Sequence, residues 1–172
     1  VVAAIGDVTA PHPSGLGLAA ITVESDMRDE WIAGDPVADP FSLAPEEIAR
    51  RTAAAGIVGL GGATFPSAVK FALGRRLKVT SLIVNGGECE PYLSSDDRMM
   101  RDHADQVVDG ARIVMHAIGA VEALVGIEDN KPEAIAAMRK AAGPYPEVKV
   151  RPVPARYPMG SDKQSIQTLT GK

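Results

Sequence analysis

Short apolar runs alternate with amphipathic stretches in the second half of the chain, and this pattern predicts strands that alternate with helices. The runs at 79–84, 121–127 and 147–153 are rich in branched apolar residues, which is typical of strands. Apolar residues recur every three to four positions within 107–118, which predicts a helix. Residues 132–142 predict a second helix, because Pro opens this range and Gly follows it.

The order strand, helix, strand, helix, strand predicts an α/β fold, with a mostly parallel sheet and helices on both of its faces. A further short helix is expected from about Gln164. Ligands of open parallel sheets bind beyond the carboxyl ends of the strands. The pattern therefore places a candidate site at residues 85–97, after the first of these strands, and at 157–162, after the third.

The beginning of the chain has a different composition. Residues 1–5 and 18–23 are apolar runs separated by a cluster of turn residues at 11–15. We expect residues 1–40 to form a partial β segment, resembling part of a barrel-sandwich, and a linker. Residues 41–172 are expected to form the α/β domain. Because the chain starts without Met and stops soon after its last predicted helix begins, we also expect a fragment of a longer polypeptide.

Composition narrows the class of protein. The 172 residues are 45% hydrophobic and 23% charged, which is ordinary for a globular protein. The net charge of −4 and an aromatic content of 4% argue against a nucleic-acid partner. No apolar run approaches the ~20 residues of a membrane span. The only cysteine, Cys89, cannot form a disulfide within the chain or hold an iron–sulfur cluster alone.

A glycine-rich segment at 56–66 is the strongest local feature. It follows a helix that is predicted to begin at Pro45 and to end at Gly56. Closely spaced glycines expose backbone N–H groups that can hold a phosphate, and Lys70 could add a positive charge. The spacing matches neither the Rossmann nor the Walker pattern. A helix stop followed by a packing turn is an equally simple interpretation.

The second feature is the loop at 85–92, which carries an amide and two carboxylates at Asn85, Glu88 and Glu90. Such groups suit a polyhydroxylated ligand, because they accept and donate hydrogen bonds. An ordinary solvated turn is the alternative. Cys89 is more typical of a small packed residue than of a nucleophile, and the three histidines lack metal-ligand spacing. We therefore assign no catalytic or metal-binding residue.

These segments, taken in order, resemble one known family. The stretches 59–70, 85–92, 96–98 and 157–164 are closely similar to the C subunit of the Rnf electron transport complex. That family is related to the NADH-binding flavoprotein of respiratory complex I. The likeness covers about 43–172 and implies a domain that binds FMN without a covalent bond and accepts a hydride from NADH.

The resemblance also implies roles for single residues. The residues expected near FMN are Gly59, Gly61, Gly62, Lys70, Asn85, Glu88, Tyr157 and Gly160. The glycines of the first segment would wrap FMN, Lys70 would pair with it electrostatically, and Asn85 and Glu88 would hydrogen-bond its ribityl chain or ring. Phe65 and Glu90 would contact NADH. Gly87 and the pair Ser161 and Asp162 depart from the complex I pattern, which has acidic residues there, so the details of NADH binding stay open.

The implied electron path continues outside this chain. Reduced flavin would release single electrons to 4Fe–4S clusters held elsewhere in the full-length protein. Partners would be other subunits of a membrane complex and ferredoxin or a similar redox protein, at the cytoplasmic face of the bacterial inner membrane. Two alternatives remain: a docking module of the same complex without catalysis, and an unrelated phosphate-ligand enzyme.

Overall fold

A computed structural model describes residues 1–9, 13–31, 33–60 and 63–172. Within these residues the chain divides into two compact units, Val1–Val37 and Ala38–Lys172. The first unit is a hairpin of two antiparallel strands, β1 (Val2–Thr9) and β2 (Gly17–Val23), in which Ile5 pairs with Ile21. Most of its apolar side chains are exposed, and a two-stranded hairpin alone is marginally stable in water.

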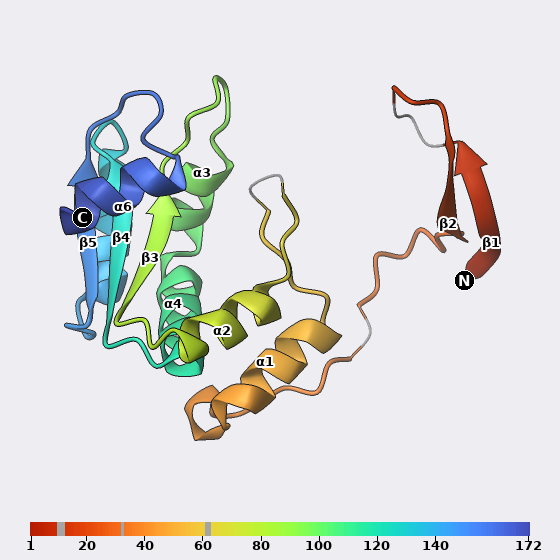
Figure 1. Ribbon diagram of the computed structural model, residues 1–172, viewed down its shortest axis with the longest axis horizontal. Helices are drawn as coiled ribbons and strands as arrows, with labels where there is room; N and C mark the ends of the chain where they lie inside the picture. Colours follow the sequence, from red (N-terminus) through yellow and green to blue (C-terminus); the bar gives the residue numbers. More distant parts are fainter. Residues whose placement is uncertain (10–12, 32, 61–62) are drawn as a thin grey trace. The chain divides into compact units, whose positions relative to one another are not determined.

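The second unit is built on a parallel sheet of three strands, as Figure 1 shows. The strands are β3 (Ser81–Gly86), β4 (Glu122–Glu128) and β5 (Val148–Val153), and they lie side by side in this order. Their register aligns Val84 with Val125, and Val125 with Val150, so the carboxyl ends meet at one edge. The predicted α/β fold with a parallel sheet is confirmed.

Helices cover both faces of this sheet. On one face, Ala123, Val125 and Ile127 of β4 join the core formed with α4 (Ala104–Ile118) and α5 (Pro132–Ala142). Side chains alternate along a strand, so Gly126 points to the other face, where α6 (Asp162–Thr170) lies. A methyl group at Gly126 would lie 3.0 Å from Leu169 of α6, which shows how closely that helix approaches.

Further helices precede and follow β3. They are η1 (Pro40–Ser42), α1 (Pro45–Ala54), α2 (Ser67–Arg76) and α3 (Ser95–Asp102). The sequence pattern did not predict α2. Its Phe71 is buried against Ile48 of α1 and Ile118 of α4, so tertiary packing stabilises this helix more than its own amphipathic pattern does. Gly74 lies inside α2, which continues to Arg76. A methyl group at Gly74 would lie 3.1 Å from Ile118, so glycine at this position lets α2 and α4 pack closely.

Candidate functional site

Two loops begin at the carboxyl ends of β3 and β5. The β3 loop comprises residues 87–94 and the α6 loop comprises residues 154–161. Asn85, near the end of β3, forms hydrogen bonds to both loops. Its Nδ2 donates to the carbonyl oxygen of Gly160 at 2.6 Å. Its Oδ1 accepts from the backbone N–H of Gly87 at 3.1 Å, and the hydroxyl of Ser165 in α6 lies 3.3 Å from the same oxygen. Asn85 thus fixes the two loops against each other.

Gly87 and Gly160 bring the backbones of these loops into direct contact. A methyl group on Gly160 would lie 2.7 Å from the carbonyl oxygen of Gly87 and 2.7 Å from Sγ of Cys89. The N–H of Gly160 donates to that sulfur at 2.8 Å. Only glycine fits at position 160, because backbone atoms of the opposite loop cannot move away as a flexible side chain could.

A pocket of about 210 Å³ lies where these loops meet. It is lined by Gly87, Cys89, Glu90, Tyr157, Pro158, Gly160 and Ser161. The structure therefore brings together Glu90, Tyr157 and Gly160, three of the residues that the sequence singled out. Ligand pockets usually measure ~300–1,000 Å³, so this one suits part of a larger ligand. Tyr157 is largely exposed and free to cover a planar group.

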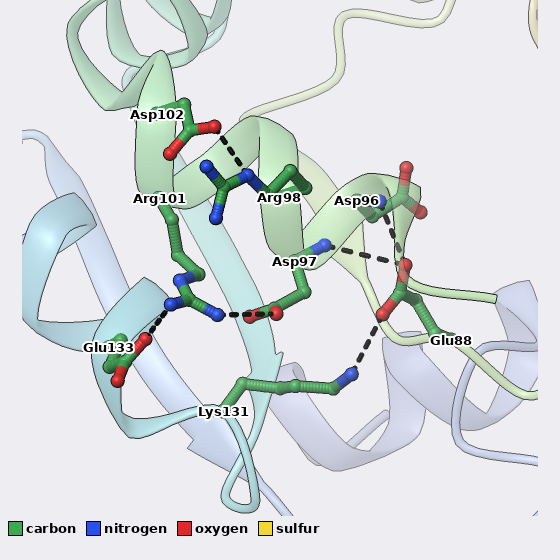
Figure 2. Close-up of polar contacts among 8 residues, drawn as sticks. All are labelled: Glu88, Asp96, Asp97, Arg98, Arg101, Asp102, Lys131 and Glu133. Carbon is green, nitrogen blue, oxygen red and sulfur yellow. Dashed lines mark hydrogen bonds and ion pairs between the residues drawn. The ribbon is translucent and has the colours of Figure 1, made fainter. Parts of the chain in front are cut away.

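Glu88 lies in the same loop but is engaged elsewhere (Figure 2). Its side chain is 4% exposed. Oε1 accepts from the backbone N–H groups of Asp96 at 2.8 Å and Asp97 at 3.4 Å, which are orphan donors in the first turn of α3. Oε2 accepts from Nζ of Lys131 at 2.9 Å. Three hydrogen bonds within the protein thus hold this carboxylate, and its expected bond to a ligand remains a prediction.

The glycine-rich segment at 56–66, called here the glycine loop, forms a second group of predicted residues. Val58 and Pro66 form an antiparallel bridge, and the N–H of Gly59 donates to the carbonyl oxygen of Phe65 at 2.9 Å. Nζ of Lys70 lies 5.9 Å from the centre of the Phe65 ring, and a methyl group on Gly59 would come within 3.1 Å of that nitrogen. The predicted Gly61 and Gly62 lie outside the described residues.

These groups suit FMN in their chemistry. The lysine ammonium and the N–H groups of a glycine loop are typical partners of a phosphate. The pocket lined in part by Gly87 and Gly160 lies at the carboxyl ends of the parallel strands, where ligands of such sheets bind. The residues present therefore fit the cofactor that the resemblance implies.

Two pKa shifts reflect the charges around Glu88. Partial burial raises the pKa of Asp96, although the residue keeps an exposed surface, and the nearby carboxylates of Glu88 and Glu90 raise it further. The hydrogen bond to Glu88 raises the pKa of Lys131, against an opposing effect of burial. Lys131 is thus held in its charged form.

Sequence reasoning missed Lys131 and Ser165. Lys131 is 43 residues from Glu88 and Ser165 is 80 residues from Asn85, so no local spacing connects either pair. The register of the sheet brings them close, since Lys131 follows β4 and Ser165 follows β5. Only a correct sheet order could have indicated these contacts.

Comparison with protein families matches residues 52–172 to the Nuo51 FMN-binding domain. The match covers more than half of the chain, including both groups of site residues. The chain belongs to this family. Among the described residues, no helix is long and apolar enough to cross a membrane.

Two relatives of this chain carry the same name. The chain is 49% identical, over 99% of its length, to the C subunit of the ion-translocating oxidoreductase complex of Rhodobacter capsulatus. It is 46% identical, over 94% of its length, to the protein of the same name from Haemophilus influenzae strain PittEE. The chain spans only 33% and 25% of these two relatives. The resemblance to the Rnf family that the motifs indicated is confirmed.

A solved structure supports the same fold. An NAD⁺-reducing [NiFe]-hydrogenase in the H₂-reduced state aligns with a TM-score of 0.65 and 26% identity. The alignment covers 78% of this chain and 25% of the hydrogenase chain. The arrangement of the sheet and its helices is therefore shared with a protein whose name includes NAD⁺ reduction.

Proposed function

We propose that this chain binds FMN and forms the NADH-oxidising flavin module of an Rnf-type electron transport complex. The observation that carries the proposal is the pocket at the carboxyl ends of β3 and β5, lined by residues of both loops including Gly87, Tyr157 and Gly160. Membership of an FMN-binding domain family supports FMN as that ligand. The name of the hydrogenase neighbour supports NADH as the electron donor.

The residues would divide the work between the two groups. Lys70 and backbone N–H groups of the glycine loop, including Gly61 and Gly62, would hold the phosphate of FMN. Asn85 and Gly160 would hold the two loops at the distance that the ribityl chain or ring requires. Phe65 and Glu90 would orient the nicotinamide nucleotide. FMN, when bound, supplies a group that takes a hydride and gives up electrons singly.

The rest of the path would involve other parts of the complex. Because Cys89 is the only cysteine in this sequence, 4Fe–4S clusters would have to be held by other segments or subunits. We propose ferredoxin or a similar protein as the redox partner. The chain would lie at the cytoplasmic face of the bacterial inner membrane, held there by partner subunits.

Titration of the full-length protein with FMN tests this function. We expect a yellow protein with the absorbance bands of a bound flavin, and loss of those bands when NADH is added without oxygen. NADPH serves as the matched donor for comparison. A protein that associates with its partners but stays colourless after FMN titration would contradict the proposal and favour a docking module. Stabilisation by inorganic phosphate as strong as that by FMN would favour an unrelated phosphate-ligand enzyme.

A further inference from the structure

Glu88 presents an unusual feature, a carboxylate that is almost fully buried beside a candidate ligand pocket. Its neighbours in sequence, Gly87 and Cys89, both line that pocket. The Glu88 side chain turns away from the pocket-lining residues and reaches the first turn of α3. Any movement of Glu88 would therefore displace the two residues that form this side of the pocket.

Lys131 provides the opposite charge from a different part of the sheet. It is the N-cap residue of α5, and its ammonium lies 2.9 Å from Oε2 of Glu88 with a side chain that is 20% exposed. The ion pair connects the loop after β4 with the loop after β3 (Figure 2). The hydrogen bond raises the pKa of Lys131, so the lysine stays charged.

A second set of ion pairs, formed by Arg101, also connects α3 with α5. Arg101 of α3 lies 3.4 Å from Oδ2 of Asp97, in the first turn of the same helix. The other end of its guanidinium contacts Glu133, in the first turn of α5. The N-terminal ends of α3 and α5 are thus connected twice, once through Lys131 and once through Arg101. Of these two connections, the one through Lys131 extends to a residue of the β3 loop.

Removal of one partner from a buried ion pair has a larger effect than removal of both. A lone buried charge loses its solvation without compensation, whereas a neutral pair of similar size is often tolerated. Without Lys131, the Glu88 carboxylate would lose this charged partner and would move toward water. That movement would weaken the hydrogen bonds to Asp96 and Asp97 and shift the β3 loop.

We infer that Lys131 is a positioning residue for the flavin pocket. Its ammonium keeps Glu88 inside the protein, and Glu88 in turn fixes Gly87 and Cys89 at the pocket edge. This inference rests on the proposed function, in which that pocket receives part of FMN. Lys131 lies outside the set of residues that line the pocket, so its effect passes through Glu88.

The test compares four variants of the full-length protein: Lys131→Met, Lys131→Arg, the double variant Glu88→Gln with Lys131→Met, and Lys140→Met. Lys140 is an exposed lysine on the same helix and serves as the control. Lys131→Met should raise the FMN dissociation constant about tenfold or more, because it leaves Glu88 unpaired. Lys131→Arg should stay within about threefold of the wild type, since it keeps a cation opposite Glu88. The double variant is judged by hydrogen exchange alone, because Glu88 is itself a predicted FMN contact.

Amide hydrogen exchange supplies a readout that does not depend on flavin. Exchange of the peptides covering 86–97 should become faster in Lys131→Met and return toward the wild-type rate in the double variant. Equal FMN affinity in Lys131→Met and the wild type would overturn the inference. So would exchange of the peptides covering 86–97 that is as fast in the double variant as in the single one. A wild type that fails to bind FMN contradicts the proposed function, whereas the exchange data still decide the role of Lys131.

Lys131→Met could also lose its fold. In that case the double variant tests the inference. It removes both charges, while Gln keeps an oxygen that can accept from the N–H groups of Asp96 and Asp97 in α3. A folded double variant in which the peptides covering 86–97 exchange at the wild-type rate supports charge compensation by Lys131. A double variant that also unfolds, while Lys140→Met is stable, contradicts it.

Discussion

The β3 loop and the glycine loop are held by different means. In and beside the β3 loop, Asn85, Glu88 and Cys89 each use a side chain to bond other parts of the protein. In the described part of the glycine loop, the contacts are mostly backbone ones, such as the bond from Gly59 to Phe65. Phe65 is 42% exposed. The β3 loop therefore uses its polar side chains to bond other parts of the protein, while the described part of the glycine loop is held mainly by backbone hydrogen bonds.

This difference implies that the two loops contribute to ligand binding in different ways. A loop fixed by internal hydrogen bonds can present a preformed shape, and a preformed shape lowers the entropic cost of binding. A loop with N–H groups and a lysine at hand can contribute attraction to a phosphate. We therefore expect substitutions in the first region to affect all flavins equally. Substitutions near the glycine loop should discriminate flavins by their phosphate.

The largest expected effect is that of Gly160→Ala. The added methyl group would lie 2.7 Å from the backbone oxygen of Gly87, so the two loops must separate. We expect FMN and riboflavin affinity to fall together by about a hundredfold, with unfolding free energy reduced by about 1–3 kcal/mol. Flavin fluorescence titration and thermal unfolding measure the two effects.

Gly110→Ala is the matched control for this substitution. Gly110 lies inside α4, and a methyl group there would meet nothing within 4 Å. Because alanine favours helix formation, this variant should be more stable than the wild type by about 1 kcal/mol. Its flavin affinity should not change. Unaltered binding by Gly160→Ala would show that the β3 and α6 loops are not a preformed part of the site.

Lys70→Met should have the next largest effect. A charge-assisted bond to phosphate contributes about 1.5–3 kcal/mol, so FMN affinity should fall about tenfold or more. Riboflavin, which lacks the phosphate, should bind equally to variant and wild type. Arg76→Met, at an exposed position of the same helix, is the control. An equal loss for both flavins would mean that Lys70 holds the glycine loop in shape, and the comparison of the two loops would fail.

The fold could be predicted to a large extent because the hydrophobic patterns that distinguish strands from helices are local properties of this sequence. The three strands of the α/β unit match the predicted ranges closely, and so do α4 and α5, which were predicted at 107–118 and 132–142. The helix α2 could not be predicted, since its burial depends on Ile48 and Ile118 from distant segments. The division between α3 and α4 at His103 was also missed, because His103 leaves helical geometry (φ −130°, ψ 34°) without a Gly or Pro nearby to mark the break.

A pocket lies where the rule for parallel sheets predicted a site, between the loops that contain Glu90, Tyr157 and Gly160. Their roles in binding FMN and NADH stay predictions. The rule could not show that Glu88 bonds to α3 and Lys131, because those partners come from other elements. The family resemblance named Glu88 as a ligand without such detail. Contacts between elements are set by the folded chain, and local residue patterns carry little of that information.

The smallest expected effect concerns Asp96, whose pKa is raised above 3.8 by partial burial and by the carboxylates of Glu88 and Glu90. The folded protein therefore binds this proton more tightly than the unfolded chain, so Asp96 adds stability as the pH falls through its raised pKa, and the gain is complete below 3.8. Glu88→Gln should lower the pKa of Asp96, as followed by NMR of its carboxyl carbon. Asp96→Asn should remove this pH dependence of stability. The glycine loop has no acidic residue between 56 and 66, so it should contribute nothing to that pH dependence. An Asp96 that titrates at or below 3.8 in the wild type would mean that the carboxylates around α3 do not interact as their spacing implies.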